Sequence, residues 1–316
     1  MNETFITEKI QQLKERIGSI IVGQEQTVDL LLTAIIANGH VLIEGVPGVA
    51  KTLLARLVAK LIDTRFSRIQ FTPDLMPSDI LGTTVFNMKT QAFDFHQGPV
   101  FSDIVLVDEV NRAPAKTQAA LFEVMEERQV TIDGTTHRMG DIYTILATQN
   151  PVEQEGTYKL PEAQTDRFLM KITMGYPTLD EEVTILERHH QQAAFSRLDD
   201  VTPVITHDEL LMLRAQMGDV FVEPSLLRYI VAIVQQTRQS RAVFLGASPR
   251  ASVAMLNASK AYALLQGRSF VTPDDIQFVT PSVLQHRLLL TAEAEMQGHT
   301  ALKVAHRLLE KVEVPK

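Results

Sequence analysis

A short glycine-rich run, GVPGVAKT at 45–52, has residue types that could bind a phosphate chain. It matches the pattern G-x-x-x-x-G-K-[ST] with one departure, since Ala50 stands where the pattern has glycine. In such a loop the backbone N–H groups surround the phosphates, a lysine reaches the outer ones and a hydroxyl binds Mg²⁺. Lys51 and Thr52 hold those two positions. The run predicts a nucleotide site, with a plain strand–turn–helix as the alternative.

The flanking sequence supports the nucleotide site. An apolar stretch at 40–44 precedes the loop and a helical pattern at 52–62 follows it, so the phosphates would lie at the positive end of a helix. Gly45 and Gly48 remain where the turn must be tight. We expect Ala50 to take an ordinary right-handed conformation, which tolerates a methyl group and keeps the N–H available. On this view the substitution leaves the phosphate site intact.

Two adjacent carboxylates, Asp108 and Glu109, follow at the end of the buried run DIVLVD. In open α/β sheets ligands bind at the carboxyl ends of the strands, where Asp108 would lie. We expect Asp108 to hold Mg²⁺, directly or through water, and Glu109 to polarise an attacking water. The alternative is a solvated acidic pair after a strand.

Three further polar residues occupy positions that a nucleotide would explain. Asn150 follows the apolar run at 142–148, at the carboxyl end of the expected strand, where it could orient a water or contact the γ-phosphate; the alternative is a turn-forming Asn before Pro. Arg250 falls in the first turn of a helix, where the helix dipole disfavours a cation unless a phosphate is bound. Arg167 stands at the start of an expected strand. For both arginines the alternative is an ordinary surface side chain.

The elements that must position these residues alternate between short apolar runs and helical patterns. Such alternation, with a helical pattern at 115–128 between two runs, indicates an α/β fold with a parallel sheet. The runs predicted as strands lie at 40–44, 65–71, 103–108, 142–148 and 167–172.

Two segments interrupt this alternation and read as β-hairpins. The first spans 83–98, and the second, 129–139, carries the tight-turn pair Asp133-Gly134. They are either ordinary edge hairpins or projecting loops that touch a partner or a central pore.

Beyond residue 178 the strand runs largely disappear and capped helices dominate. A capping-box pattern begins at Thr206, and proline follows Ser248 and Thr272 at the first helical position. We therefore expect two domains, 1–178 with the nucleotide site and 179–316 with a helical lid.

The overall composition narrows the class of protein. The chain has 316 residues, 45% hydrophobic and 22% charged, with a net charge of −8. This balance gives no general attraction for nucleic acid or an anionic membrane. The absence of cysteine excludes disulfides, thiolate metal sites and cysteine nucleophiles. No segment reads as a signal peptide or a membrane span, so we expect a cytoplasmic protein without membrane insertion.

Taken together, the motifs resemble the MoxR family of AAA+ ATPases, in the clade that includes magnesium chelatase and the MCM helicases. The matching pieces extend across most of the chain and are jointly very specific. They are IVGQ (21–24), GVPGVAKT (45–52), the run from VDEVNRAP to TIDG (107–134), the run from ATQNP to DRFL (147–169), GASPRA (246–251) and VTPDDI (271–276).

The resemblance implies a role for each motif residue. Lys51 and Thr52 would be Walker A residues, and Asp108 and Glu109 Walker B residues. Asn150 would be sensor 1, Arg250 sensor 2 and Arg167 an arginine finger. Asn111 and Arg112 follow Walker B as in relatives, without an assigned role. The residues implied to contact ATP are Val22, Gly23, Gly45, Val46, Pro47, Gly48, Val49, Ala50, Lys51, Thr52, Leu53 and Asp108, with Thr52 and Asp108 on Mg²⁺.

The resemblance also implies the working form of the protein. Members of this family usually form hexameric rings with ATP at the subunit interfaces, and act as chaperone-like remodelling factors with partners that bear von Willebrand factor A domains. The alternatives are a DNA translocase or helicase, against which the acidity argues weakly, a nucleotide-gated binding module without turnover, and a metal-chelatase motor subunit.

Overall fold

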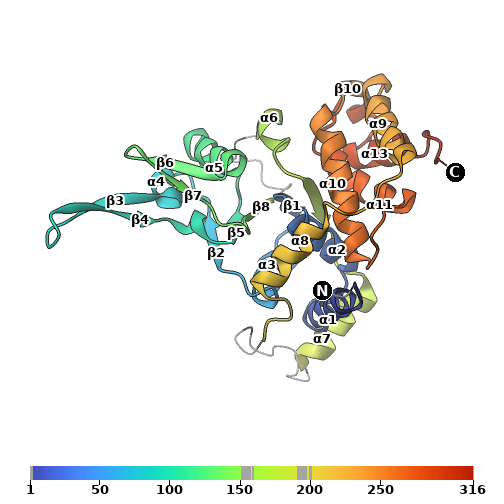
Figure 1. Ribbon diagram of the computed structural model, residues 1–316. Coiled ribbons are helices and arrows are strands. Elements are labelled where there is room, and N and C mark those ends of the chain that lie inside the picture. The colour runs from blue at the N-terminus through green and yellow to red at the C-terminus, as the bar shows by residue number, and fades with distance from the viewer. Residues whose placement is uncertain (1–2, 151–157, 159, 191–197, 199–200, 316) are drawn as a thin grey trace.

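The protein is built on a five-stranded parallel sheet in the order β2-β5-β8-β1-β9, seen in the computed structural model (Figure 1). The structure describes residues 3–150, 158, 160–190, 198 and 201–315. The five predicted strands are confirmed, although two of them begin two or three residues later than expected. The strands are β1 (Val41–Gly45), β2 (Phe66–Gln70), β5 (Ile104–Asp108), β8 (Thr144–Gln149) and β9 (Met170–Met174).

Hydrophobic side chains cover both faces of this sheet, which explains why the central strands read as continuous apolar runs. Ile104 and Leu106 point into one core, and Val105 and Val107, with opposite pleat, point into the other. One core lies against the N-terminal helices and the C-terminal helical segment, and the other against α5 and the hairpins. The helices of the N-terminal part up to α5 are α1 (Glu3–Ile20), α2 (Glu25–Ile36), α3 (Lys51–Leu61), α4 (Pro77–Leu81) and α5 (Ala115–Glu127).

Both predicted hairpins are present, and the longer one projects away from the body of the molecule (Figure 1). Strands β3 (Gly82–Asn87) and β4 (Ala92–Gln97) form the longer hairpin, in which Phe86 stands opposite Phe93. Strands β6 (Gln129–Ile132) and β7 (Thr135–Arg138) form the shorter one. Its turn residues Asp133 and Gly134 both have positive φ, 49° and 78°, as the Asp-Gly signal requires.

The C-terminal part is helical, as expected, and carries one small antiparallel sheet of β10 (Val243–Leu245) and β11 (Leu289–Leu290). Thr206 and Glu209 form the predicted capping box, and Ser248 and Thr272 are the N-caps of proline-led helices. The remaining elements are η1 (Pro99–Phe101), α6 (Glu162–Thr165), α7 (Leu179–His190), α8 (His207–Gln216), α9 (Pro224–Gln239), α10 (Pro249–Leu265), α11 (Pro273–Leu284), α12 (Ala292–Met296) and α13 (Ala301–Leu309).

Helices after residue 178 contact the N-terminal helices: α10 packs against α2, and α7 and α8 add polar contacts. Arg188 of α7 donates to the carbonyls of Gly18 and Ser19 at the end of α1. Arg214 of α8 donates from Nε to the carbonyl of Ile35 in α2 at 3.1 Å. The division at residue 178 stays a prediction. Among the described residues, no helix combines the length and apolar character that crossing a membrane requires.

Candidate nucleotide site

Three of the predicted motifs meet at the carboxyl edge of the sheet. The glycine loop follows β1, Asp108 ends β5, and Asn150 comes directly after β8. Strand β8 lies between β1 and β5, with Ile43 opposite Thr148 and Val107 opposite Ala147. Because parallel strands present their carboxyl ends at one edge, the order of strands brings the loop, the acidic pair and Asn150 together.

The glycine loop has the close contacts and turns that its sequence predicts. A side chain at Gly45 would collide with the backbone carbonyl of Met174 on β9, only 2.9 Å from the added carbon. Gly48 has a φ of +87°, which favours glycine. Lys51 opens α3 and folds back over the loop, where its ammonium donates to the carbonyls of Gly45 at 2.6 Å and Val46 at 3.3 Å. The loop therefore leads directly into a helix N-terminus, the arrangement that favours phosphate.

The expected conformation of Ala50 is wrong. Its φ of 61° and ψ of 23° place it in the left-handed region, as the N-cap of α3. At this position the chain turns from the loop into the first helical residue, Lys51. An L-residue other than glycine in that region costs about 1–2 kcal/mol. The alanine is thus strained, although its N–H remains part of the loop.

Asp108 is buried and already faces positive charge. Its Oδ2 accepts from Nε of Arg68 at 2.6 Å, and its Oδ1 accepts from the hydroxyl of Thr148 at 3.1 Å. A carboxylate and a threonine hydroxyl are the oxygen donors that a hard cation prefers, and a cation at Asp108 would displace the Arg68 guanidinium from Oδ2. Asp108 and Thr52 therefore fit the predicted Mg²⁺ role.

Glu109 is held by neighbours from two directions. Its φ of +57° is unusual for a glutamate, and its N–H donates to the hydroxyl of Thr148 at 3.0 Å. Its carboxylate accepts from Nε2 of Gln70 at 2.7 Å and pairs with Nε of Arg112 at 3.2 Å. The strained backbone aims the carboxylate along the carboxyl edge, where a water could be activated.

Sequence reasoning missed Arg68, Gln70 and Thr148. Arg68 and Gln70 alternate in β2, so their side chains share one face, and Gln70 lies opposite Asp108 in the register. Polar residues at alternate positions of a strand were the available signal, but the pairing of β2 with β5 could not be known. Asn150 is buried at 8% exposure, and the motif residues 151–157 that follow it lie outside the described residues.

Arg167 and Arg250 do not join this group. Both pair with Glu126 in the last turn of α5: Nε of Arg167 lies 3.3 Å from Oε2, and Nη2 of Arg250 lies 2.7 Å from Oε1. Arg167 also lies three residues before β9 begins, not at the start of the strand as predicted. A turn stabilised by its N–H bond to the carbonyl of Gln164 delays the strand to Met170.

This arginine pair lies at the amino edge of the sheet. Just beyond Arg167, the N–H of Leu169 donates to the carbonyl of His40, the residue before β1. His40 also contacts the carbonyl of Met125 through Nε2 at 3.1 Å, which places the end of α5 at the same edge. A five-residue strand spans about 16 Å. The arginines are therefore separated from the glycine loop of their own chain by the length of the sheet.

Comparisons with known proteins agree with this architecture. Residues 40–170 match the family described as ATPase family associated with various cellular activities (AAA), and residues 235–309 match the AAA lid domain. The chain is 44% identical over 310 residues to Chaperone MoxR1 of Mycobacterium tuberculosis, covering 94% of this chain and 80% of MoxR1. It is 47% identical over 301 residues to the uncharacterized protein YeaC of Bacillus subtilis, covering 95% and 93%. The crystal structure of a protein from Cytophaga hutchinsonii has a TM-score of 0.91 at 40% identity, covering 99% and 97%.

A parallel sheet with a glycine loop at its carboxyl edge, followed by an AAA lid, defines a protein of the AAA+ class. Within that class the chain belongs to the MoxR family of AAA+ ATPases.

Proposed function

We propose that the protein hydrolyses ATP in a ring of identical subunits, in which each active site is shared by two neighbours. The observation that carries this proposal is the separation of the two groups of site residues. The glycine loop, Asp108 and Glu109 lie at the carboxyl edge of the sheet, and Arg167 and Arg250 lie at the amino edge. Two copies in head-to-tail contact bring the opposite edges together, and repetition of that contact closes a ring.

The carboxyl edge supplies binding and water activation. Backbone N–H groups of 45–52 surround the phosphates, and the Lys51 ammonium leaves the carbonyls of Gly45 and Val46 for the outer phosphates. Thr52 and Asp108 would hold Mg²⁺, which would neutralise charge on the phosphate chain. Glu109 accepts a proton from the attacking water, and Asn150 orients that water. Val22 and Gly23 lie near the base, as the family resemblance implies.

The amino edge supplies the charge that the transition state needs. Two arginines share the carboxylate of Glu126, so this group of three residues has a net positive charge. In the assembled ring Arg167 reaches the γ-phosphate held by the next subunit, where charge spreads over the equatorial oxygens during transfer. Arg250, exposed beside it, acts on the same nucleotide.

The ring uses this cycle for chaperone-like remodelling in the cytoplasm, with a hexameric assembly and a partner that bears a von Willebrand factor A domain. What supports this part is the family membership and the printed name of the relative Chaperone MoxR1. The projecting hairpin β3–β4, which exposes Phe93 and Met88, offers an apolar surface for a client.

Assembly-dependent turnover tests the shared site. Phosphate release per subunit should rise with protein concentration and follow the formation of rings, measured in parallel by mass photometry. The Lys51→Ala variant gives the background rate of phosphate release that does not come from the proposed site. A turnover per subunit that is the same for monomers and rings would show that each subunit contains a complete site, and the proposal would fail.

A further inference from the structure

Arg287, a residue without a role so far, is almost completely buried between the lid and the core. Only 4% of its side chain is exposed. Its guanidinium donates to three carbonyls of the segment 166–169: Asp166 at 3.1 Å, Phe168 at 2.6 Å and Leu169 at 3.0 Å. Its Nε also donates to the Asp166 carboxylate at 2.6 Å. The segment that contains Arg167 is thus wrapped around one cation of the lid.

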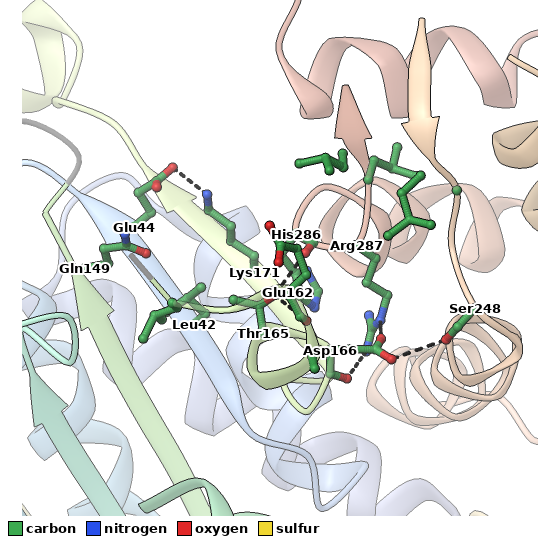
Figure 2. Close-up of a pocket in the computed structure, with 16 residues that line it drawn as sticks. Leu42, Glu44, Gln149, Glu162, Thr165, Asp166, Lys171, Ser248, His286 and Arg287 are labelled. Atoms are coloured by element: carbon green, nitrogen blue, oxygen red, sulfur yellow. Dashed lines mark hydrogen bonds and ion pairs between the residues drawn. The ribbon is translucent and has the colours of Figure 1, made fainter. Parts of the chain in front are cut away.

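Asp166 extends this contact to the second arginine. While its Oδ1 accepts from Arg287, its Oδ2 accepts from the hydroxyl of Ser248 at 3.2 Å (Figure 2). Ser248 is the N-cap of α10 and stands two residues before Arg250. One carboxylate therefore connects the segment of Arg167 with the helix start that carries Arg250.

Neighbouring lid residues bind the same stretch of core backbone. His286 contacts the carbonyl of Phe168 through Nε2 at 3.0 Å, and Nε2 of Gln285 donates to the carbonyl of Lys171 at 2.6 Å. Beside these contacts lies a cavity of about 610 Å³ between β1, β9 and the lid (Figure 2). Because the core and lid are not packed solidly here, directional polar contacts set where the segment lies.

We propose that Arg287 is a positioning residue that fixes Arg167 and, through Asp166, the start of α10 with Arg250, so that the lid and the arginine pair move as one unit. The inference rests on the proposed function, because it concerns the residues given to the neighbouring subunit. A lysine cannot replace Arg287, since a single ammonium lacks the planar fork that reaches the three carbonyls and the carboxylate together. The hydrogen bonds of Arg287 go to residues 166–169 and to the carbonyl of Val283, not to the loop 45–52 of the same subunit.

Mixing of subunits tests this role, because in a mixed ring the carboxyl edge and the amino edge of one active site can come from different variants. Arg287→Met should hydrolyse ATP on the order of 100-fold more slowly, part of the factor of about 10³–10⁵ that a finger supplies, while ATP affinity stays within twofold. Mixed with Lys51→Ala, which keeps its arginine pair, Arg287→Met should regain activity. Mixed with Arg167→Ala, which lacks the finger, it should not. Arg287→Lys should behave in the same way, and Arg307→Met, a matched change on the exposed face of α13, should be active alone.

Each outcome decides the matter. Recovery with Arg167→Ala, or full activity of Arg287→Met alone, would overturn the inference. Failure of both Arg287 variants to recover with Lys51→Ala, despite native melting and co-assembly, would also overturn it, since the role would then extend to the nucleotide pocket. If Arg287→Met does not fold, Arg287→Lys alone decides. The pair Lys51→Ala with Arg167→Ala is the reference: no recovery there refutes the shared site itself.

Discussion

The two edges of the central sheet are built in different ways. At the carboxyl edge the loop 45–52 is one continuous segment, and Asp108 and Glu109 are adjacent in the chain. At the amino edge Glu126, Arg167 and Arg250 come from three distant parts of the sequence. We therefore expect binding of the phosphate chain to depend on local sequence, and presentation of the arginines to depend on tertiary structure and on the position of the lid.

The charges at the two edges become complementary when nucleotide binds. The carboxylates of Asp108 and Glu109 are paired with Arg68 and Arg112, and the Lys51 ammonium adds a positive charge at the carboxyl edge. At the amino edge two arginines share one glutamate. ATP brought to the first edge makes it negative, and this favours contact with the second edge of another subunit.

The largest effect at the carboxyl edge is expected from Glu109→Gln. Glutamine is nearly isosteric but cannot accept a proton from water, so turnover should fall by a factor of about 10²–10⁴ while ATP binding is kept. The control is Glu127→Gln, the same change at an exposed glutamate that ends α5, and this variant should hydrolyse ATP at the wild-type rate. Steady-state phosphate release checks this. Wild-type turnover in Glu109→Gln would remove Glu109 from the catalytic role.

Lys51→Ala, at the same edge, should weaken the binding of ATP. Loss of a charge-assisted contact to the outer phosphates corresponds to about 3 kcal/mol, or roughly 100-fold weaker ATP binding. Lys60→Ala, in the last turn of the same helix α3, should bind ATP normally. Calorimetric titration measures both, and an unchanged affinity for Lys51→Ala would contradict the assignment of the loop.

Acid should lower the stability of the folded state through protonation of His40 at the amino edge. Its Nδ1 accepts from the N–H of Ile145, and burial, with a smaller effect of Arg128, lowers the pKa of His40 to about 3. The folded pKa lies below the unfolded value of about 6.5. The folded state therefore binds fewer protons, and stability is lost as the pH falls from about 6.5 towards 3.

This loss should amount to about 1.4 kcal/mol per pH unit for His40. Burial also lowers the pKa of His286, so part of the pH dependence will remain in any single variant. The free energy of unfolding, measured by urea titration between pH 7.5 and 5.5, should fall less steeply with decreasing pH for His40→Asn than for wild type. For His306→Asn, an exposed control, this pH dependence should equal that of wild type. Equal slopes in His40→Asn and wild type would contradict this account.

The smallest effect concerns Ala50. Glycine has no penalty in the left-handed region, so Ala50→Gly should raise the free energy of unfolding by up to about 1 kcal/mol, reduced by the greater entropy of the unfolded glycine. ATP affinity should stay within threefold. Ala55→Gly, inside the same helix, should instead lower stability by about 1 kcal/mol or more. Destabilisation of similar size in both variants would show that Ala50 is not strained.

Much of the fold could be predicted because its signals are local. The apolar runs fixed the five strands, the Asp133-Gly134 pair fixed the tight turn, and Ser248 before Pro249 marked the start of α10. The conformation of Ala50 could not be predicted in this way. Its backbone angles depend on the loop geometry on both sides of it, and not on the size of its own side chain alone.

The order of the strands and the partners of the site residues required the structure. Nothing in the run at 65–71 shows that β2 pairs with β5, and therefore the contact between Gln70 and Glu109 could not be predicted from the sequence. Likewise, Arg287 and Asp166 are 121 positions apart in sequence, and only tertiary packing brings them together. Family resemblance suggested a finger at Arg167, but its place at the amino edge comes from the three-dimensional arrangement.

The shared active site is tested most directly by mixing Lys51→Ala with Arg167→Ala. Arg167→Ala should bind ATP nearly normally and hydrolyse it more slowly by a factor of about 10³–10⁵, and Lys51→Ala should be inactive because its pocket fails. In a mixed ring an intact pocket can stand beside an intact finger, so activity should return on mixing and rise with the concentration that favours assembly. No recovery in samples whose co-assembly is shown by native mass spectrometry would contradict a finger that acts on the neighbouring subunit.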